Sequence, residues 1–261
     1  METSQTILLI LVSFGASWLT FFSGFGLGTL LTPVFYLLLG DLTLAIAATA
    51  VVHLSNNIFK FLLMQKNVNW KIVIPFGLAA IPAAMLGAYL ISHFTDISLL
   101  KYNLFGNIKS VKLINLIFGI VLIGFALIEL VEKWSIAFSK QSLWLGGLIS
   151  GFFGGLSGHQ GALRTAFLVK YQLEKQAFIA TGIVIALVID FTRIPMYFRE
   201  TPVADLQAEW PIISISIVSA VVGAILGKLF LKKIKFDVLT IAISIGMIIF
   251  GLALALGLLE K

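Results

Sequence analysis

Apolar positions along the chain fall into eight long blocks, separated by short segments that hold most of the charged and turn-forming residues. The blocks cover residues 6–39, 43–63, 71–92, 111–131, 143–169, 175–197, 208–231 and 236–259. Six of them have about 20 to 24 residues, the length of one membrane-spanning helix at about 1.5 Å per residue. Because lipid offers no partner to backbone polar groups, such blocks predict an all-α polytopic membrane protein.

The first and fifth blocks differ from the rest because they are interrupted by glycines. The first carries Gly24, Gly26 and Gly28, followed by Pro33, and the fifth carries Gly151, Gly154, Gly155, Gly158 and Gly161. Glycine permits the backbone angles that a reversal of the chain inside the membrane requires. We therefore expect each of these blocks to form two short helices joined by a bend deep in the membrane.

The composition excludes a water-soluble protein. Of 261 residues, 59% are hydrophobic and 11% are charged, against about a quarter charged in an ordinary soluble domain. The apolar blocks leave no room for a second, soluble domain, so residues 1–261 are expected to form one transmembrane domain. The chain has no cysteine, which excludes disulfides and thiolate metal sites. Its first residues include an acid and no base, so no cleaved signal peptide is expected.

The two halves of the sequence carry matching motifs in the same order. Gly28-Thr-Leu-Leu-Thr32 matches Gly161-Ala-Leu-Arg-Thr165, and each follows a Ser-Gly pair. An Ala-rich stretch in the second block also matches one in the sixth block, and both end in an Ala-Thr pair. Such internal similarity is typical of membrane proteins built from two structural repeats.

We interpret the chain as two homologous halves, residues 1–131 and 143–261, joined by a loop over residues 132–142. Each half is expected to be a glycine-broken helical hairpin plus three transmembrane helices. If each hairpin returns to the side it came from, the second half is inverted, and eleven basic residues fall on one side of the membrane against six on the other. Eight simple crossings would split the same charges nine to eight, so the positive-inside rule favours an inverted repeat.

In this arrangement the basic side has Lys60, Lys66, Lys71, Lys133, Lys140, Lys170, Lys175, Lys228, Lys232, Lys233 and Lys235. The other side has Lys101, Lys109, Lys112, Arg193, Arg199 and Lys261, three of which belong to an expected loop over residues 93–112. The net charge of +6 follows from these loops, and no pattern indicates nucleic-acid binding.

Polar residues accompany both glycine breaks. Ser23, Thr29 and Thr32 lie by the first, and Ser157, His159, Gln160, Arg164 and Thr165 lie by the second. A half-helix that begins after each break would point free N–H groups and a positive dipole end at the membrane midplane, which suits an anion. Close packing through small-residue spacings is the alternative, and we favour it for Gly223 and Gly227.

Arg164 lies inside an apolar stretch, where a charged side chain costs about 2.5 to 3.5 kcal/mol on insertion scales. Three arrangements would compensate for that cost. The guanidinium binds an anion, or it pairs with Asp190 or Glu174, or it extends to the nearby loop at Lys170.

His53, Asn56 and Asn57 have helical spacing in the second block, with Thr49 one turn earlier. Sharing one face of a spanning helix, they are expected to line a cavity; hydrogen bonds between helices are the alternative. His53 and His159 are also candidates for proton coupling, because imidazole changes charge near neutral pH.

Asp190 and Arg193 have i, i+3 spacing near the outer end of the sixth block. They are read as a gate or as an ion pair, and we favour a solvent-exposed pair.

An enzymatic reading finds little support. Gly155-Leu-Ser157-Gly158 has the form of the serine motif of rhomboid proteases, but no histidine follows His159 to serve as base, and His53 would have to come from the other half. Three scattered histidines without a carboxylate at ligand spacing predict no metal site, and no cofactor is expected.

The two glycine-rich breaks, Phe22-Ser-Gly-Phe-Gly-Leu-Gly-Thr-Leu-Leu-Thr-Pro33 and Gly151-Phe-Phe-Gly-Gly-Leu-Ser-Gly-His-Gln-Gly-Ala-Leu-Arg164, each precede an Ala-rich helix with an Ala-Thr pair. Over essentially its whole length the sequence resembles the sulfite exporter TauE/SafE family of membrane permeases. The resemblance implies a multi-pass protein of the bacterial cytoplasmic membrane that exports sulfite or an organosulfonate such as sulfoacetate by alternating access.

The expected binding residues are Ser23, Gly24, Gly26, Gly28, Thr29, His53, Asn56, Asn57, Ser157, Gly158, His159, Gln160, Gly161 and Arg164. The expected partners are a small anionic organosulfur substrate and membrane lipid, and the small-residue faces are compatible with a homodimer. An anion channel or a permease for another carboxylate or oxyanion is the alternative function. A membrane scaffold or an intramembrane serine protease is a more remote one.

Overall fold

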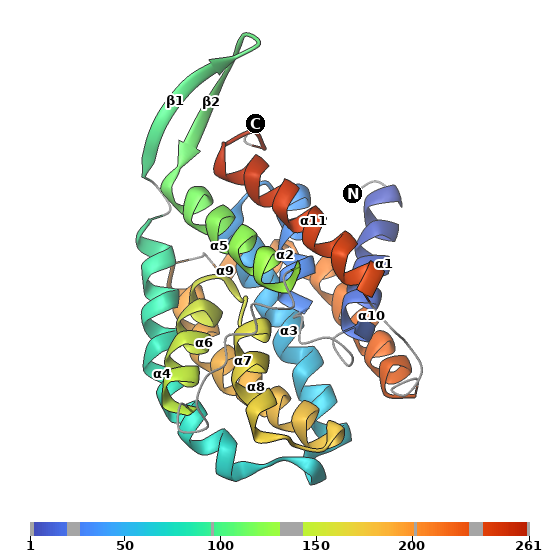
Figure 1. The fold of residues 1–261 in the computed structure, drawn as a ribbon. Helices are drawn as coiled ribbons and strands as arrows, with labels where there is room; N and C mark the ends of the chain where they lie inside the picture. The colour runs from blue at the N-terminus through green and yellow to red at the C-terminus, as the bar shows by residue number, and fades with distance from the viewer. Residues whose placement is uncertain are drawn as a thin grey trace.

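The computed structural model describes residues 3–19, 27–94, 97–130, 143–200, 203–229 and 237–259. These residues form eleven α-helices, two short 3-10 turns and one β-hairpin (Figure 1). The helices are α1 Thr3–Leu19, α2 Leu27–Leu39, α3 Leu42–Met64, α4 Trp70–His93, α5 Leu113–Leu130, α6 Leu143–Ser157, α7 Gly161–Leu168, α8 Lys175–Glu200, α9 Val203–Ala208, α10 Trp210–Leu229 and α11 Asp237–Ala255. The 3-10 turns are η1 Gln65–Asn67 and η3 Val169–Tyr171, and the strands are β1 Ser98–Leu104 and β2 Asn107–Lys112.

The helices have the length and polarity of a multi-pass membrane protein. Among the described residues, four stretches are long and apolar enough to cross a membrane, and they coincide with α3, α4, α8 and α10. Large apolar side chains along their outer faces are exposed, as lipid contact requires. The predicted helical membrane architecture is therefore confirmed in its main feature.

The first and fifth apolar blocks each contain two helices, as predicted. The first holds α1 and α2, and residues 20–26 between them, including Ser23, Gly24 and Gly26, lie outside the described residues. The fifth holds α6 and α7, and the break between them is described throughout. Gly158 ends α6 with a φ of +78°, and its N–H donates to the carbonyl of Gly154 at 2.9 Å. This left-handed cap is the usual role of glycine at a helix end.

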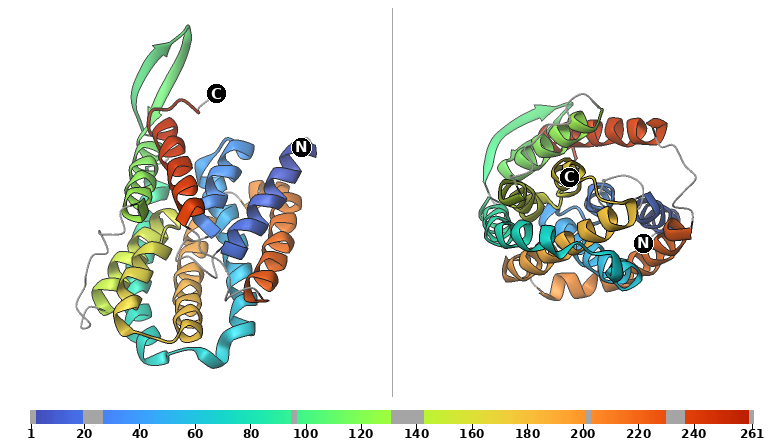
Figure 2. Two further views of the ribbon diagram at one scale, coloured as in Figure 1. Left: turned by 45° about the vertical axis from the view of Figure 1, so that its right-hand side comes forward. Right: turned by 60° about the horizontal axis from the view of Figure 1, so that its bottom comes forward.

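The two broken segments return toward opposite ends of the bundle. The chain after α2 lies by the start of α5, where Tyr36, Asp41 and Lys112 line one pocket. After α7 the chain instead passes to the start of α8, where Gln176 accepts a hydrogen bond from Asn67 of η1 at 3.1 Å. We call these the hairpin end and the η1 end. Both chain termini lie at the hairpin end (Figures 1 and 2).

Helix pairing follows a regular pattern between the two halves of the chain. α4 packs on α6 and α10 packs on α1, while α4 also contacts α8 and α10 also contacts α3. The pairs α3 with α8 and α5 with α11 each join one half to the other. If α1 is exchanged for α6, α3 for α8 and α4 for α10, the α4–α6 contact becomes the α10–α1 contact. The α4–α8 contact likewise becomes the α10–α3 contact.

Glycines allow the closest of these contacts. Gly147, Gly151 and Gly155, one turn apart on α6, face the backbone of α4 at Phe76, Ala80 and Ala84. On the other side of the molecule Gly223 of α10 faces the backbone of α1 at Phe14. Without Cβ atoms, helices in lipid gain dispersion contact along their backbones. The packing role favoured for Gly223 is consistent with this geometry.

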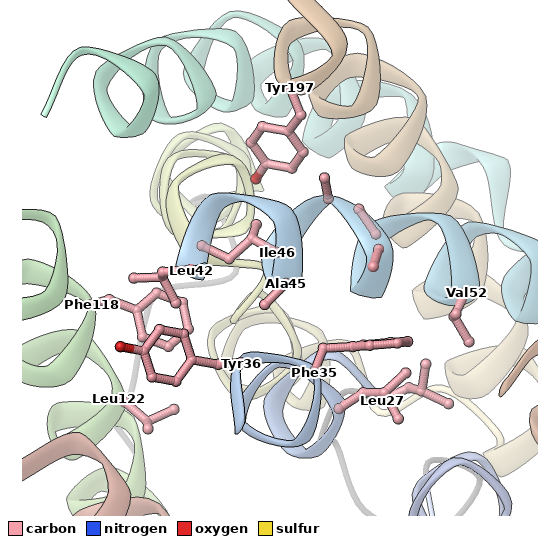
Figure 3. Packing of buried hydrophobic residues seen from close by; sticks show 14 of the residues in the cluster. Leu27, Phe35, Tyr36, Leu42, Ala45, Ile46, Val52, Phe118, Leu122 and Tyr197 are labelled. Carbon is pink, nitrogen blue, oxygen red and sulfur yellow. The ribbon is translucent and has the colours of Figure 1, made fainter. Parts of the chain in front are cut away.

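Buried apolar side chains fill the space between α2, α3 and α5. Phe118 and Leu122 of α5 lie beside Tyr36 of α2 and Leu42 of α3 (Figure 3). Phe35 of α2 is fully buried in the same cluster. The cluster holds α2, the second helix of the first broken segment, against the long helix α3.

The expectation of a loop over residues 93–112 is wrong, and so is the expectation of a purely helical fold. β1 and β2 pair antiparallel and extend beyond the bundle (Figure 2). Phe105 and Gly106 at the turn have φ values of 50° and 83°, the type of tight turn that matches the twist of paired strands. Tyr102 and Lys109 of the hairpin donate to the carbonyls of Leu256 and Leu258, at 2.6 and 3.2 Å.

Replacing Gly155 with alanine should destabilise the protein, because its Cβ would strike the backbone of Ala84 in α4. Overpacking of this kind costs about 1–3 kcal/mol. Gly246→Ala is the matched control, since a Cβ there meets nothing within 4 Å and alanine favours a helix by up to about 1 kcal/mol. Thermal unfolding of the purified protein in detergent measures both. Equal midpoints for the two variants would contradict the tight α4–α6 contact.

Candidate functional site

A buried ionic cluster joins the two halves of the protein where α3 meets α8. Asp190 of α8 accepts from His53 Nδ1 of α3 at 2.6 Å and from Arg193 Nε at 2.9 Å. Arg193 Nη2 lies at 2.9 Å from the same carboxylate, and Asn57 Nδ2 at 3.4 Å. The carboxylate is therefore surrounded by donors from both helices, which offsets the cost of burying its charge.

Arg193 also binds the end of α6, next to the second break. Its Nη1 donates to the carbonyl of Gly154 at 3.3 Å, and Tyr197, one turn further along α8, donates to the carbonyl of Gly155. The last carbonyls of a helix have no partner within the helix and form the negative end of its dipole. The Gly154 carbonyl already accepts from the N–H of Gly158, so the guanidinium adds a second hydrogen bond there and a positive charge at the negative end of the dipole.

Gly158 is required at the break for two reasons. Its positive φ is unfavourable for other residues, and a Cβ at this position would lie 2.9 Å from Arg193 Nη1. The bend between α6 and α7 is thus in direct contact with the ionic cluster.

The expectation that Asp190 and Arg193 form an exposed pair is wrong. Asp190 is 0% exposed and Arg193 is 1% exposed. The i, i+3 spacing identified the pair correctly, but α8 contacts α3, α4 and α6, so this face points into the protein.

Lys60 is likewise not a surface lysine, as the count of basic residues had assumed. It is 3% exposed, and its Nζ donates to the carbonyl of Ser17, in the last turn of α1, at 3.1 Å. Lys60 therefore binds a carbonyl in the last turn of α1, as Arg193 binds one in the last turn of α6. Lys60 and Arg193 are separated by 133 positions, one more than the interval that relates Thr49 to Thr181 on the same two helices, so the two basic residues are near rather than exact counterparts.

The expected polar face of α3 divides into two groups. His53 and Asn57 point to Asp190 on α8, whereas Asn56 lies 2.9 Å from Ser17 Oγ on α1. The amide orientation that suits all neighbours of Asn56 lets its oxygen accept from Lys60 and its nitrogen donate toward α10. Residues at i+3 and i+4 lie on opposite sides of residue i around a helix. Asn56 therefore faces α1, while Asn57 faces α8.

Four residues beside the breaks have buried polar side-chain atoms that make no hydrogen bond. They are Thr49 (Oγ1), His159 (Nε2), Gln160 (both amide atoms) and Arg164 (Nη1). Native proteins leave few buried polar atoms unpaired, so such a group calls for an explanation. Thr181, the counterpart of Thr49 in the second half, by contrast accepts from the N–H of Asn69 at 3.0 Å.

The start of α2 meets the second break at this place. A Cβ on Gly28, at the start of α2, would lie 3.3 Å from the carbonyl oxygen of Gly158 and 3.8 Å from Thr49 Cγ2. Gly28, Thr29, Gly158 and Gly161 are all buried. The backbones of the two broken segments are therefore in contact through glycine.

Among the described residues, no direct ion pair joins Arg164 to a carboxylate, although Asp190 attracts it electrostatically. The carboxylate of Asp190 is occupied by His53 and Arg193, and Glu174 is exposed near the η1 end. The Arg164 side chain instead lies along α8 at Gly182, where a Cβ would be 3.2 Å from its Nε. Its Nη1 is buried, while the residue as a whole is partly exposed. Anion binding by Arg164 stays a prediction.

His159 and Ser157 are neighbours but not a catalytic pair. The carbonyl of Ser157 can only accept, so the bond of 2.9 Å from His159 Nδ1 places the ring proton on Nδ1. Ser157 Oγ donates to the carbonyl of Phe153 at 3.1 Å, so its hydroxyl is not free to donate to a substrate. The imidazole lies between Phe118 and Phe125 of α5, with ring centroids 5.4 and 5.8 Å away.

Long apolar helices, two broken segments in contact and a buried ionic cluster together define a multi-pass helical membrane protein. A model of the sulfite exporter TauE/SafE family matches residues 9–255, and the chain belongs to this family. It is therefore a membrane transporter and not an enzyme or a scaffold. No curated protein and no solved structure matches the chain.

Asp190→Ala should destabilise the protein by about 3–5 kcal/mol, because it leaves the buried Arg193 without its counter-charge. The double variant Asp190→Leu with Arg193→Met should recover most of this loss, since it removes both charges. Chemical denaturation of the purified protein in detergent measures the two effects. A single variant as stable as wild type would show that Asp190 and Arg193 are solvated rather than paired in the core.

Proposed function

We propose that this transporter exports a small sulfur-containing anion, sulfite or an organosulfonate such as sulfoacetate, across the bacterial cytoplasmic membrane. The observation that carries the proposal is the set of unpaired polar atoms at the second break, with the Arg164 guanidinium among them. The family model supports a sulfur anion as the cargo. The match between donors and cargo is one of charge and hydrogen bonding, with no covalent step.

The start of α7 supports an anion rather than a neutral or cationic cargo. Gln160 precedes α7 and makes no side-chain bond to its free N–H groups, and the amide of Gln160 is itself unpaired. Arg164 lies in the first turn of the helix. Free N–H groups, the positive end of the dipole and a guanidinium all stabilise negative charge. Charge-assisted bonds of this kind suit the oxygen atoms of a sulfite or sulfonate group.

Glycines at the breaks would let the anion approach the backbone. Gly28, Gly158 and Gly161 have no side chain to cover the amide groups, and Thr49 would add a hydroxyl from the first half. His159, whose ring stacks on Phe125 of α5, would line the same anion site with its Nε2. Of the other expected ligands, His53 and Asn57 belong to the ionic cluster and Asn56 to the contact with Lys60, so we assign them no direct contact with the anion.

The burial of this site favours a carrier over a channel. Thr49, His159 and Gln160 are each no more than 3% exposed, so an anion could reach them only after a conformational change. Alternating access supplies such a change when one half of a transporter moves against the other around a fixed site. The contact of the two breaks at Gly28 and Gly158 would place the site at the junction of the halves.

We further propose that the halves, residues 1–131 and 143–261, are an inverted repeat joined through residues 132–142. Three observations support it: the exchange symmetry of the helix contacts, the return of the two broken segments to opposite ends, and the matching roles of Lys60 and Arg193. Lipid is the surrounding partner. The proposal needs no second protomer, because both halves of the site come from one chain.

Arg164→Ala should weaken the binding of sulfite and sulfoacetate by roughly 10- to 100-fold, because a hydrogen bond to a charged group contributes about 1.5–3 kcal/mol. Calorimetry on the purified protein measures the affinity. Lys170→Ala, which removes a nearby surface charge, is the control and should bind as wild type. Binding that survives Arg164→Ala unchanged would remove Arg164 from the site. No binding to wild type would remove the sulfur-anion assignment.

Because the chain has no cysteine, single cysteines can report its orientation directly. Lys109→Cys on the hairpin should react with an impermeant maleimide added to intact cells, and Lys66→Cys in η1 should react only after the cells are permeabilised. This outcome follows from the orientation that the sequence-based count of basic residues favours, with the loop at Lys66 on the more basic side. Reaction of both variants from the same side would contradict the proposed topology.

A further inference from the structure

We infer that His53 is a proton-binding site, and that it takes up a proton together with the anion that the second break binds. The inference rests on the proposed function and adds a coupling ion to it. Its starting point is the geometry of one histidine: His53 is 5% exposed, lies on α3 and binds Asp190 on α8 at 2.6 Å. It is thus the imidazole in direct contact with the cluster that joins the halves.

The hydrogen bonds of His53 leave one ring nitrogen free to take a proton. A carboxylate accepts, so the short contact places a proton on Nδ1, and Nε2 keeps its lone pair. The Asn57 amide lies beside the ring, with its Nδ2 3.4 Å from Nε2 and 3.1 Å from Nδ1. A proton from water that binds Nε2 converts the ring to imidazolium, while the Nδ1–H bond to Asp190 stays in place. Rotation of the Asn57 amide then offers its oxygen to the new N–H.

Because of the charges around His53, we expect its protonation to require a bound anion. Asp190 and Arg193 carry opposite charges, so a protonated His53 adds a positive charge to a region that already holds Arg164, which Asp190 attracts, and Lys60 on the same helix as His53. α1 and α2 have no charged residue among those described. Lys228 of α10 binds the carbonyl of Leu63 at the η1 end, and Lys66 of η1 and Asp205 of α9 are exposed. A bound anion is therefore the charge that would balance a protonated His53.

A continuous set of contacts connects His53 to the anion site. His53 binds Asp190, Asp190 binds Arg193, and Arg193 binds Gly154 and abuts Gly158 at the break. By linkage, an anion that favours the proton must be favoured by the proton to the same degree. When the anion leaves, the uncompensated imidazolium releases its proton, so the two cross the membrane together.

Nitrogen NMR of protein labelled with ¹⁵N-histidine tests the inference, because the chain has only three histidines. The His53 signals are assigned by comparison with His53→Gln. We expect His53 Nε2 to change from neutral to protonated as pH falls from 8 to 5, and saturating sulfoacetate to raise the protonated fraction at pH 6.5 at least twofold. Arg164→Ala should abolish the effect of sulfoacetate.

Each other result overturns a defined part of the inference. If sulfoacetate binds but leaves the protonation of His53 unchanged, coupling is wrong and the proposed function stands. If His53 stays neutral throughout this pH range, it is not a proton site. If sulfoacetate does not bind to wild type, the proposed function fails as well. The pH and sulfoacetate titrations use wild-type protein, and the variants serve only for signal assignment and as the control.

Flux through proteoliposomes gives the second test. With the membrane potential clamped by potassium and valinomycin, a sulfoacetate gradient should change the internal pH of wild-type vesicles that hold a pH-sensitive dye. His53→Gln keeps a donor to Asp190 but cannot titrate, so it should move sulfoacetate with at least a tenfold smaller pH change per anion. His93→Gln, at the exposed end of α4, should behave as wild type. An unchanged pH signal in His53→Gln would overturn the inference.

Discussion

A helix that stops inside a membrane leaves its last carbonyls without partners, and no water is present in lipid to replace them. In the described part of this protein, carbonyls in the last turns of α6 and α1 each accept a hydrogen bond from a basic side chain of a long neighbouring helix. Arg193 of α8 binds the end of α6, and Lys60 of α3 binds the end of α1. The remaining features of the core follow from placing these two cations where charge is expensive.

The two cations are compensated differently, which makes the halves chemically unequal. Arg193 has a carboxylate, Asp190, and that carboxylate also holds His53 of the other half. Lys60 has the amide of Asn56 and a backbone carbonyl beside it. The hydrogen-bonded neighbours of Arg193 thus include a carboxylate, whereas these two neighbours of Lys60 are uncharged. Arg164, which replaces Leu31 of the first half, adds to the same asymmetry.

Much of the architecture could be predicted from the sequence, because membrane crossing is a matter of length and polarity. The broken segments were predictable from their glycines. What could not be predicted was which side of a helix faces which neighbour. Asp190 and Arg193 were placed outside although α8 turns them inward, and Lys60 was counted as a surface charge because it lies one turn from the end of α3. The short alternating strands of the hairpin were hidden by the stronger signals of the helices on either side.

The hairpin has a mechanical consequence for the molecule. It emerges from the connection between α4 and α5, in the first half, yet Tyr102 and Lys109 hold the chain just after α11, in the second half. α5 and α11 are already packed against each other with Gly119 and Gly251 at their contact. Any rotation between the halves must therefore break these two bonds, or carry the hairpin, α5 and α11 along as a single rigid body.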